Sequence, residues 1–102
     1  MTHDELEQLF RRGDSSNDAL RIRLIAARKA VDLGQKDVAA AIGVAKQTYH
    51  SQEARGAPSI KTGRYFYRAH RIDFNYLFNG DFDQLPSDVR DKLSAALVAE
   101  SE

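Results

Sequence analysis

The chain has no cysteine and no tryptophan, and only two of its 102 residues are proline. The lack of cysteine excludes disulfides, thiolate metal sites and cysteine nucleophiles. No apolar run approaches the roughly 20 residues of a membrane-spanning helix, and the N-terminal sequence MTHDELEQLFRR is too polar for a secretory signal. We therefore expect a cytoplasmic protein without a membrane segment, and its length fits one domain with a modest core.

The net charge of the whole chain is zero, but its charged residues are unevenly distributed. Fifteen Lys and Arg balance fifteen Asp and Glu over the whole chain. Residues 21–72 hold eleven basic and three acidic side chains, a net charge of +8, whereas both flanking segments are acidic. A basic surface supplies most of the affinity of proteins for nucleic acid. The middle of the chain is therefore the candidate for DNA binding, and the acidic flanks either limit non-specific binding, face a partner or keep the chain soluble.

Apolar residues recur with helical spacing along the chain, and neither strand-like alternation nor an internal repeat occurs. Thr2 and Glu5 form a capping-box pattern before a short first helix that ends near Arg12. A polar break follows, and a second helix is expected to end near Leu33, with Arg23 among the basic residues on its outer side. We predict an all-helical fold.

The segment from Gln35 to Glu53, QKDVAAAIGVAKQTYHSQE, has the pattern of two short helices joined by a turn. Gly43 lies where the first of them must end, because glycine adopts a left-handed conformation without a Cβ clash. Tyr49 occupies an apolar position of the second helix and is expected in the core. The other side chains of that helix offer many hydrogen-bonding groups and little net charge, as contacts with base edges in the major groove require.

Several features of this region carry a family resemblance: Gln35 at the start of a helix, AAAIGV at 39–44, TYHSQE at 48–53, Pro58-Ser59, and DFNYLFNGD at 73–81. Their order and separation resemble the helix-turn-helix of the phage Cro and repressor (Cro/cI-type, XRE) family. The resemblance covers about residues 20–81 and implies a compact five-helix, phage-repressor-like DNA-binding domain at 17–81. Residues 1–16 then form an N-terminal segment with a short helix, and residues 82–102 a C-terminal helix and candidate dimerisation element.

The resemblance also implies roles for individual side chains. The residues at base-contacting positions are Lys46, Gln47 and Ser51, with His50 close enough to contribute. The phosphate-contacting candidates are Gln35, Thr48, Arg55 and Lys61. Lysine suits the acceptors of guanine and glutamine can bond adenine in two places, while phosphate contacts fix the register. The alternative for Gln47 and Ser51 is an ordinary solvated helix surface.

No metal ion, cofactor or catalytic site is expected. His3, His50 and His70 are far apart in sequence and lack acid or thiol ligands at a recognised spacing. The Ser, His and Asp residues form no nucleophile motif, and the glycines form no phosphate-binding loop. We therefore expect a protein that binds its partner without catalysing a reaction.

The segment after the helix-turn-helix leaves one question open. Pro58 is expected to start a helix whose inward-facing residues are Ile60, Phe66, Tyr67 and Ala69. Gly63 interrupts this pattern, and a glycine inside a helix costs about 1 kcal/mol relative to alanine. Gly63 therefore either admits a close neighbour or marks a late start of the helix.

A homodimer is expected, because a single recognition helix contacts only a few base pairs and two half-sites require two copies. The C-terminal segment holds more apolar residues than the small domain needs, which makes it the first candidate interface: Phe82, Leu85, Val89, Leu93 and Leu97. The alternative is that this helix folds back onto its own core. The first helix is the second candidate interface, through Leu6, Leu9 and Phe10.

Three functions are compatible with these features. The first is a sequence-specific transcriptional regulator, a Cro-like repressor that binds a palindromic double-stranded DNA operator. The second is an antitoxin of the same fold, which would bind DNA and also cover a toxin partner. The third is a helical interaction module whose basic face meets an acidic protein.

Overall fold

The computed structural model describes all 102 residues, which form seven α-helices and no strand. The helices are α1 (His3–Phe10), α2 (Asn17–Ala30), α3 (Gln35–Ile42), α4 (Lys46–Arg55), α5 (Ile60–His70), α6 (Phe74–Asn79) and α7 (Ser87–Ser101). The predicted all-helical fold is confirmed. None of these helices combines the length and the apolar character that crossing a membrane requires.

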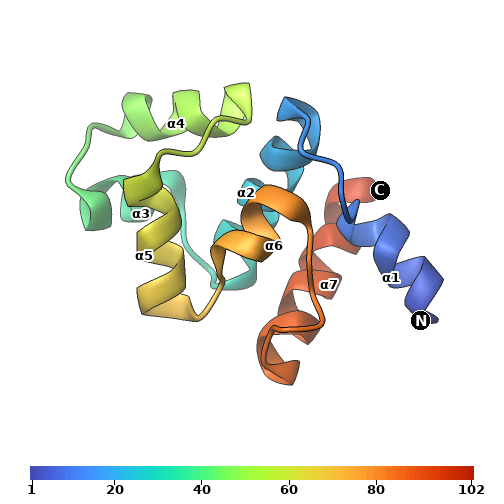
Figure 1. The fold of residues 1–102 in the computed structure, drawn as a ribbon. Coiled ribbons are helices and arrows are strands. Elements are labelled where there is room, and N and C mark those ends of the chain that lie inside the picture. Colours follow the sequence, from blue (N-terminus) through green and yellow to red (C-terminus); the bar gives the residue numbers. More distant parts are fainter.

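The central helix is α2, which packs against α4, α6 and α7 (Figure 1). Ser16 begins it, because its side chain accepts a hydrogen bond from the Ala19 N–H. Ala26 and Ala27 are fully buried, and such small side chains let neighbouring helices approach closely. The helix ends at Ala30, earlier than predicted, and the chain then turns through a left-handed Asp32 with φ +57°.

The C-terminal helix α7 belongs to the core of the molecule. It lies along α2, and α1 packs against it on the side away from α3 and α5 (Figure 1). The predicted interface residues of this segment are all buried within the chain: Phe82, Leu85, Val89, Leu93 and Leu97. Phe10 of α1 is also fully buried. The prediction that these side chains form a dimer interface is therefore wrong, because they close the hydrophobic core of a single copy.

Arg23 of α2 departs most clearly from the predicted pattern, because it lies in the core with 1% of its surface exposed. Its Nε donates to the Leu77 carbonyl (3.1 Å), and its other nitrogens donate to the carbonyls of Phe10 (3.0 Å), Arg11 (3.1 Å) and Asp14 (2.6 Å). Burial lowers the pKa of Arg23. The guanidinium thus joins α2 to the end of α1, the following turn and α6, and it satisfies carbonyls that helix ends leave unpaired.

Gly63 lies inside α5 because an aromatic ring occupies the space that a side chain would need. A Cβ at Gly63 would lie 2.3 Å from Cε1 of Phe74. Of the two alternatives, the close neighbour is correct, and α5 begins at Ile60. Phe66 is buried as predicted, whereas Ile60 and Tyr67 are 62% and 54% exposed and Ala69 is also exposed, so the predicted inward orientation of these three is wrong.

Candidate nucleic-acid interface

The helix-turn-helix segment has the predicted helices and turn. Gly43 ends α3 in a left-handed conformation with φ +73°, and its N–H bonds to carbonyls of the last turn of α3. Tyr49 is fully buried and anchors α4 to the domain, as predicted. Burial raises the pKa of Tyr49, and the neighbouring Glu53 raises it further. No side chain caps the start of α4 at Ala45, which leaves its first N–H groups open to an external acceptor.

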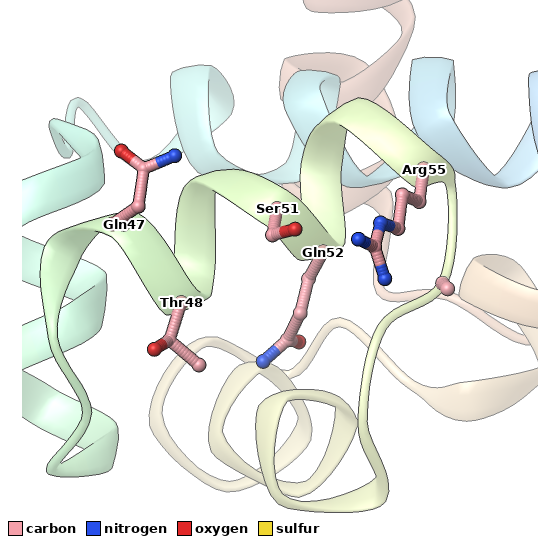
Figure 2. A pocket seen from close by; sticks show the side chains of 6 residues that line it. Gln47, Thr48, Ser51, Gln52 and Arg55 are labelled. Carbon is pink, nitrogen blue, oxygen red and sulfur yellow. The ribbon is translucent and has the colours of Figure 1, made fainter.

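The outer face of α4 presents polar side chains around an open hollow of about 440 Å³ (Figure 2). The residues that line it are Gln47, Thr48, Ser51, Gln52, Arg55 and Ala57. Gln47, Ser51 and Arg55 follow each other at intervals of four, which places them on one face of the helix. The structure therefore brings together two predicted base-contacting residues and two predicted phosphate-contacting residues. Lys46 is exposed at the start of the same helix.

His50 and Gln35 lie apart from this hollow and contact each other. His50 Nδ1 is 3.1 Å from Gln35 Oε1, and Gln35 Nε2 donates to Glu53 Oε1 at 2.9 Å. The side-chain amide of Gln35 thus links the start of α3 to α4. The Gln35 side chain is therefore engaged within the protein. The N-terminal end of α3 could still bind a phosphate, because its first backbone N–H groups have no partner within the helix.

Glu53 holds the helix-turn-helix unit to α2 through a buried ion pair. Arg28 donates to its two carboxylate oxygens, from Nε at 2.6 Å and from a terminal nitrogen at 3.2 Å, and also to the Leu33 carbonyl at 3.1 Å. Burial raises the pKa of Glu53, but the hydrogen bonds from Arg28 and Gln35 outweigh burial and leave this pKa below its ordinary value. The ion pair therefore fixes the orientation of α4 relative to α2 and α3.

We expect the free energy of unfolding to decrease as the pH falls below about 4.5, the ordinary pKa of a glutamate. The unfolded chain binds a proton at Glu53 near that pH, whereas the folded chain binds it only at lower pH, so the stabilisation by the carboxylate is complete above this range and is lost below it. Urea unfolding at several pH values measures the effect. Glu53→Gln should flatten the profile.

A matched control for this prediction is Asp88→Asn. Asp88 pairs with Arg71 on the surface, where both side chains are more than half exposed and solvent screens their attraction. Arg71 lowers the pKa of Asp88, but because solvent screens this exposed pair, the variant should change the pH profile much less than Glu53→Gln does. If the Glu53→Gln profile also parallels that of the wild type, the buried ion pair does not contribute as described.

The basic side chains of α3, α4 and α5 differ from most others in having no ion pair. Most exposed cations elsewhere contact a carboxylate: Arg11, Arg12, Arg21, Lys29 and Arg71. The unpaired cations of α3, α4 and α5 are all exposed: Lys36, Lys46, Arg55, Lys61, Arg64 and Arg68. The only acids on these helices are Asp37 and the buried Glu53. This part of the molecule therefore offers positive charge that a phosphate backbone can use.

Arg64 and Arg68 were not among the residues that the sequence predicted to contact DNA. With Lys61 they line an open hollow of about 270 Å³ between α5 and α3. The Lys61 ammonium reaches the α3–α4 turn, where it would lie 3.7 Å from a Cβ at Gly43. The spacing of 61, 64 and 68 along one helix face is the sequence signal that could have identified them.

Gln52 links α4 to the start of α5. Its Oε1 accepts hydrogen bonds from the Ser59 N–H (2.9 Å) and the Thr62 hydroxyl (2.6 Å). The Ser59 side chain in turn caps α5 by accepting from the Thr62 N–H at 3.1 Å. These contacts hold the start of α5, and with it the base of the Lys61 side chain, at a fixed position beside α4.

Comparisons of the chain with models of protein families, with curated proteins and with solved structures found no match. The resemblance of residues 20–81 to the Cro and repressor family therefore stays a prediction. Function is inferred from the side chains on α3, α4 and α5.

Proposed function

We propose that the protein binds double-stranded DNA sequence-specifically by placing α4 in the major groove. The observation that carries this proposal is that the polar outer face of α4 lies among six exposed cations of α3, α4 and α5 that form no ion pair. The major groove admits an α-helix, and its base edges carry the donors and acceptors that amide and hydroxyl groups recognise. Unpaired cations beside the groove would neutralise phosphates and release counterions.

Each side chain then has a role that follows from its position. Lys46, Gln47 and Ser51 face the bases, because they lie at the start and along the outer face of α4. The phosphate contacts come from both sides of that helix: Thr48, Arg55, Lys61 and the N-terminal end of α3 at Gln35. His50 contacts Gln35 and is also exposed, so it supports the recognition helix and remains a candidate for a base contact.

DNA binding of this kind fits a cytoplasmic transcriptional regulator. Two copies on a palindromic operator would contact two half-sites about 34 Å apart, which is one turn of DNA. Occupancy of the operator would exclude other proteins, as in a Cro-like repressor. The activity is binding alone and needs no cofactor.

Selection of bound duplexes from a random DNA pool supplies the operator with which the roles are tested. On that operator Gln47→Ala should weaken binding by about 1–3 kcal/mol and relax the preference at one base pair, because a base contact is lost. Lys61→Ala should weaken binding to all sequences alike and lower the slope of log K against log salt by about one. Fluorescence anisotropy at several salt concentrations measures both effects.

Matched controls come from the opposite side of the molecule. Gln8→Ala on α1 and Lys92→Ala on α7 remove the same side-chain types from exposed positions distant from α4. Both variants should bind the operator like the wild type. Equal losses for all four variants, or no selected consensus at all, would refute the proposed role of α4.

A further inference from the structure

His50 lies at the end of a series of hydrogen bonds that begins at the buried Arg28–Glu53 ion pair. Glu53 Oε1 is 2.9 Å from Gln35 Nε2, and Gln35 Oε1 is 3.1 Å from His50 Nδ1. Glu53 has 2% of its surface exposed, whereas His50 is an exposed residue of α4. The Gln35 amide therefore connects a buried carboxylate with an imidazole ring on the surface.

The Glu53 carboxylate fixes the orientation of the Gln35 amide. Although burial raises the pKa of Glu53, the hydrogen bonds from Arg28 and Gln35 hold this pKa below its ordinary value. Near neutral pH the carboxylate is therefore ionised, and it can only accept hydrogen bonds. The NH2 group of Gln35 must face it, because two acceptor oxygens would repel each other. The amide oxygen of Gln35 is thereby held against His50.

The Gln35 oxygen in turn selects one tautomer of the His50 ring. A neutral imidazole carries its proton on one of its two nitrogens, and the hydrogen bond of one nitrogen decides which. Gln35 Oε1 can only accept, so Nδ1 of His50 carries the proton and donates it to this bond. Nε2 has no partner in the chain and keeps a free lone pair. The exposed side of the neutral ring is therefore a hydrogen-bond acceptor.

An acceptor on this surface has few partners on DNA. Phosphate oxygens are acceptors, and so are N7 and O6 of guanine and O4 of thymine. The donors in the major groove are the amino groups of adenine and cytosine. His50 lies four residues after Lys46, on the same side of α4 as this predicted base-contacting residue. The free lone pair of Nε2 therefore disfavours a phosphate contact and matches an amino group.

We propose that His50 is a specificity-determining residue whose Nε2 accepts a hydrogen bond from the amino group of adenine or cytosine, and that Gln35 is the positioning residue that fixes this polarity. The proposal rests on the proposed function, because it requires α4 in the major groove. At one position of one strand, adenine and cytosine would be preferred over guanine and thymine. The Gln35 side chain thus influences the choice of base without contacting DNA.

Nitrogen-15 NMR of the imidazole rings measures the tautomer in the free, full-length protein in slightly alkaline solution. The signals of His50 are identified by their absence in His50→Ala. They should show a protonated Nδ1 and an unprotonated Nε2. Gln35→Met keeps the length of the side chain but removes the acceptor, so both tautomers should be populated. A proton on Nε2 in the wild type, or an unchanged tautomer in Gln35→Met, would overturn the assigned polarity.

His70 provides the matched control for the NMR measurement. Its Nε2 is 3.0 Å from the Tyr65 hydroxyl, and it has no contact with Gln35. The signals of His70 should therefore be the same in Gln35→Met and in the wild type. Changes in both rings would indicate a general disturbance of the fold, and the dependence of His50 on Gln35 would then be refuted.

Altered operators test the contact with the base. On the selected operator, His50→Ala should relax the preference at one base pair. There, an analogue without the amino group, purine for adenine or 2-pyrimidinone for cytosine, should weaken wild-type binding about threefold to tenfold, the value of one hydrogen bond. His50→Ala should bind the natural and the altered operator alike. Gln47→Ala, which removes a different base contact, should keep the sensitivity to the analogue.

These measurements separate the inference from the proposed function. If the wild type selects an operator but His50→Ala keeps every base preference, the inference fails while the function stands. The same holds if the wild type binds the analogue as tightly as the natural base. If no sequence is selected, the proposed function fails and the base contact fails with it, whereas the NMR spectra of the free protein still report whether Gln35 fixes the tautomer.

Discussion

Replacing Arg23 with methionine should lower the free energy of unfolding by about 3–5 kcal/mol. Methionine fills a similar volume, but it leaves four carbonyl groups without their donor: those of Phe10, Arg11, Asp14 and Leu77. A buried acceptor without a partner costs about 1–3 kcal/mol, reduced where water reaches it. The loss should separate α1 and α6 from α2. Urea unfolding followed by circular dichroism measures it.

Arg21→Met is the matched control for this prediction. Arg21 lies on the same helix, but its side chain is 40% exposed and pairs with Asp18 on the surface. Its replacement should change the free energy of unfolding by less than about 1 kcal/mol. Arg23→Lys should recover only part of the loss, since an ammonium group cannot reproduce the planar fork of donors. Equal losses for Arg21→Met and Arg23→Met would contradict the role of the buried guanidinium.

Arg23 also shows where prediction from the sequence reaches its limit. Arg23 lies three residues after Leu20 and four before Ala27, and therefore on the apolar face of α2. Because its side chain is charged, however, it was predicted to lie on the opposite side of the helix. Burial of the charge became favourable only because the ends of α1 and α6 bring carbonyl groups to it. That arrangement depends on residues more than fifty positions apart, and no local pattern reports it.

Local patterns predicted the helix-turn-helix correctly. Gly43 ends α3 because a residue without Cβ adopts the left-handed turn without strain, and Tyr49 is buried because the helical period places it on the inner face. The same period placed Gln47 and Ser51 on one outer face of α4. It could not show that Gln35 and His50 contact each other or that Arg28 pairs with Glu53, because these contacts join three helices.

Apolar periodicity predicts burial without identifying what covers the residues. Leu93 and Leu97 could pack against a second copy or against α2, and the sequence pattern is the same in both cases. In the structure α2 covers them. The reverse occurs on α5, where Ile60 and Tyr67 fit an inward pattern but remain exposed because α6 packs against the neighbouring face at Gly63.

Gly56→Ala should lower the free energy of unfolding by about 3–5 kcal/mol, through backbone strain and a clash together. Gly56 ends α4 with φ +62°, a conformation that alanine adopts at a cost of about 1–2 kcal/mol. The new Cβ would also lie 1.8 Å from the Asn17 carbonyl oxygen and 3.1 Å from the Arg21 nitrogen. Both neighbours are backbone atoms of α2, so relief requires α4 to move away from α2.

Gly13→Ala separates the two contributions. Gly13 also has positive φ, at +85°, but a Cβ there would meet no atom within 4 Å. The free energy of unfolding of Gly13→Ala should therefore fall only by the conformational contribution, about 1 kcal/mol. Movement of α4 in Gly56→Ala would further strain the Arg28–Glu53 ion pair, which also joins α4 to α2. Under conditions where the protein is still folded, Gly56→Ala should bind the selected operator more weakly, whereas Gly13→Ala should bind it normally. Similar stability losses in the two variants would show that α4 is not held by its close approach to α2.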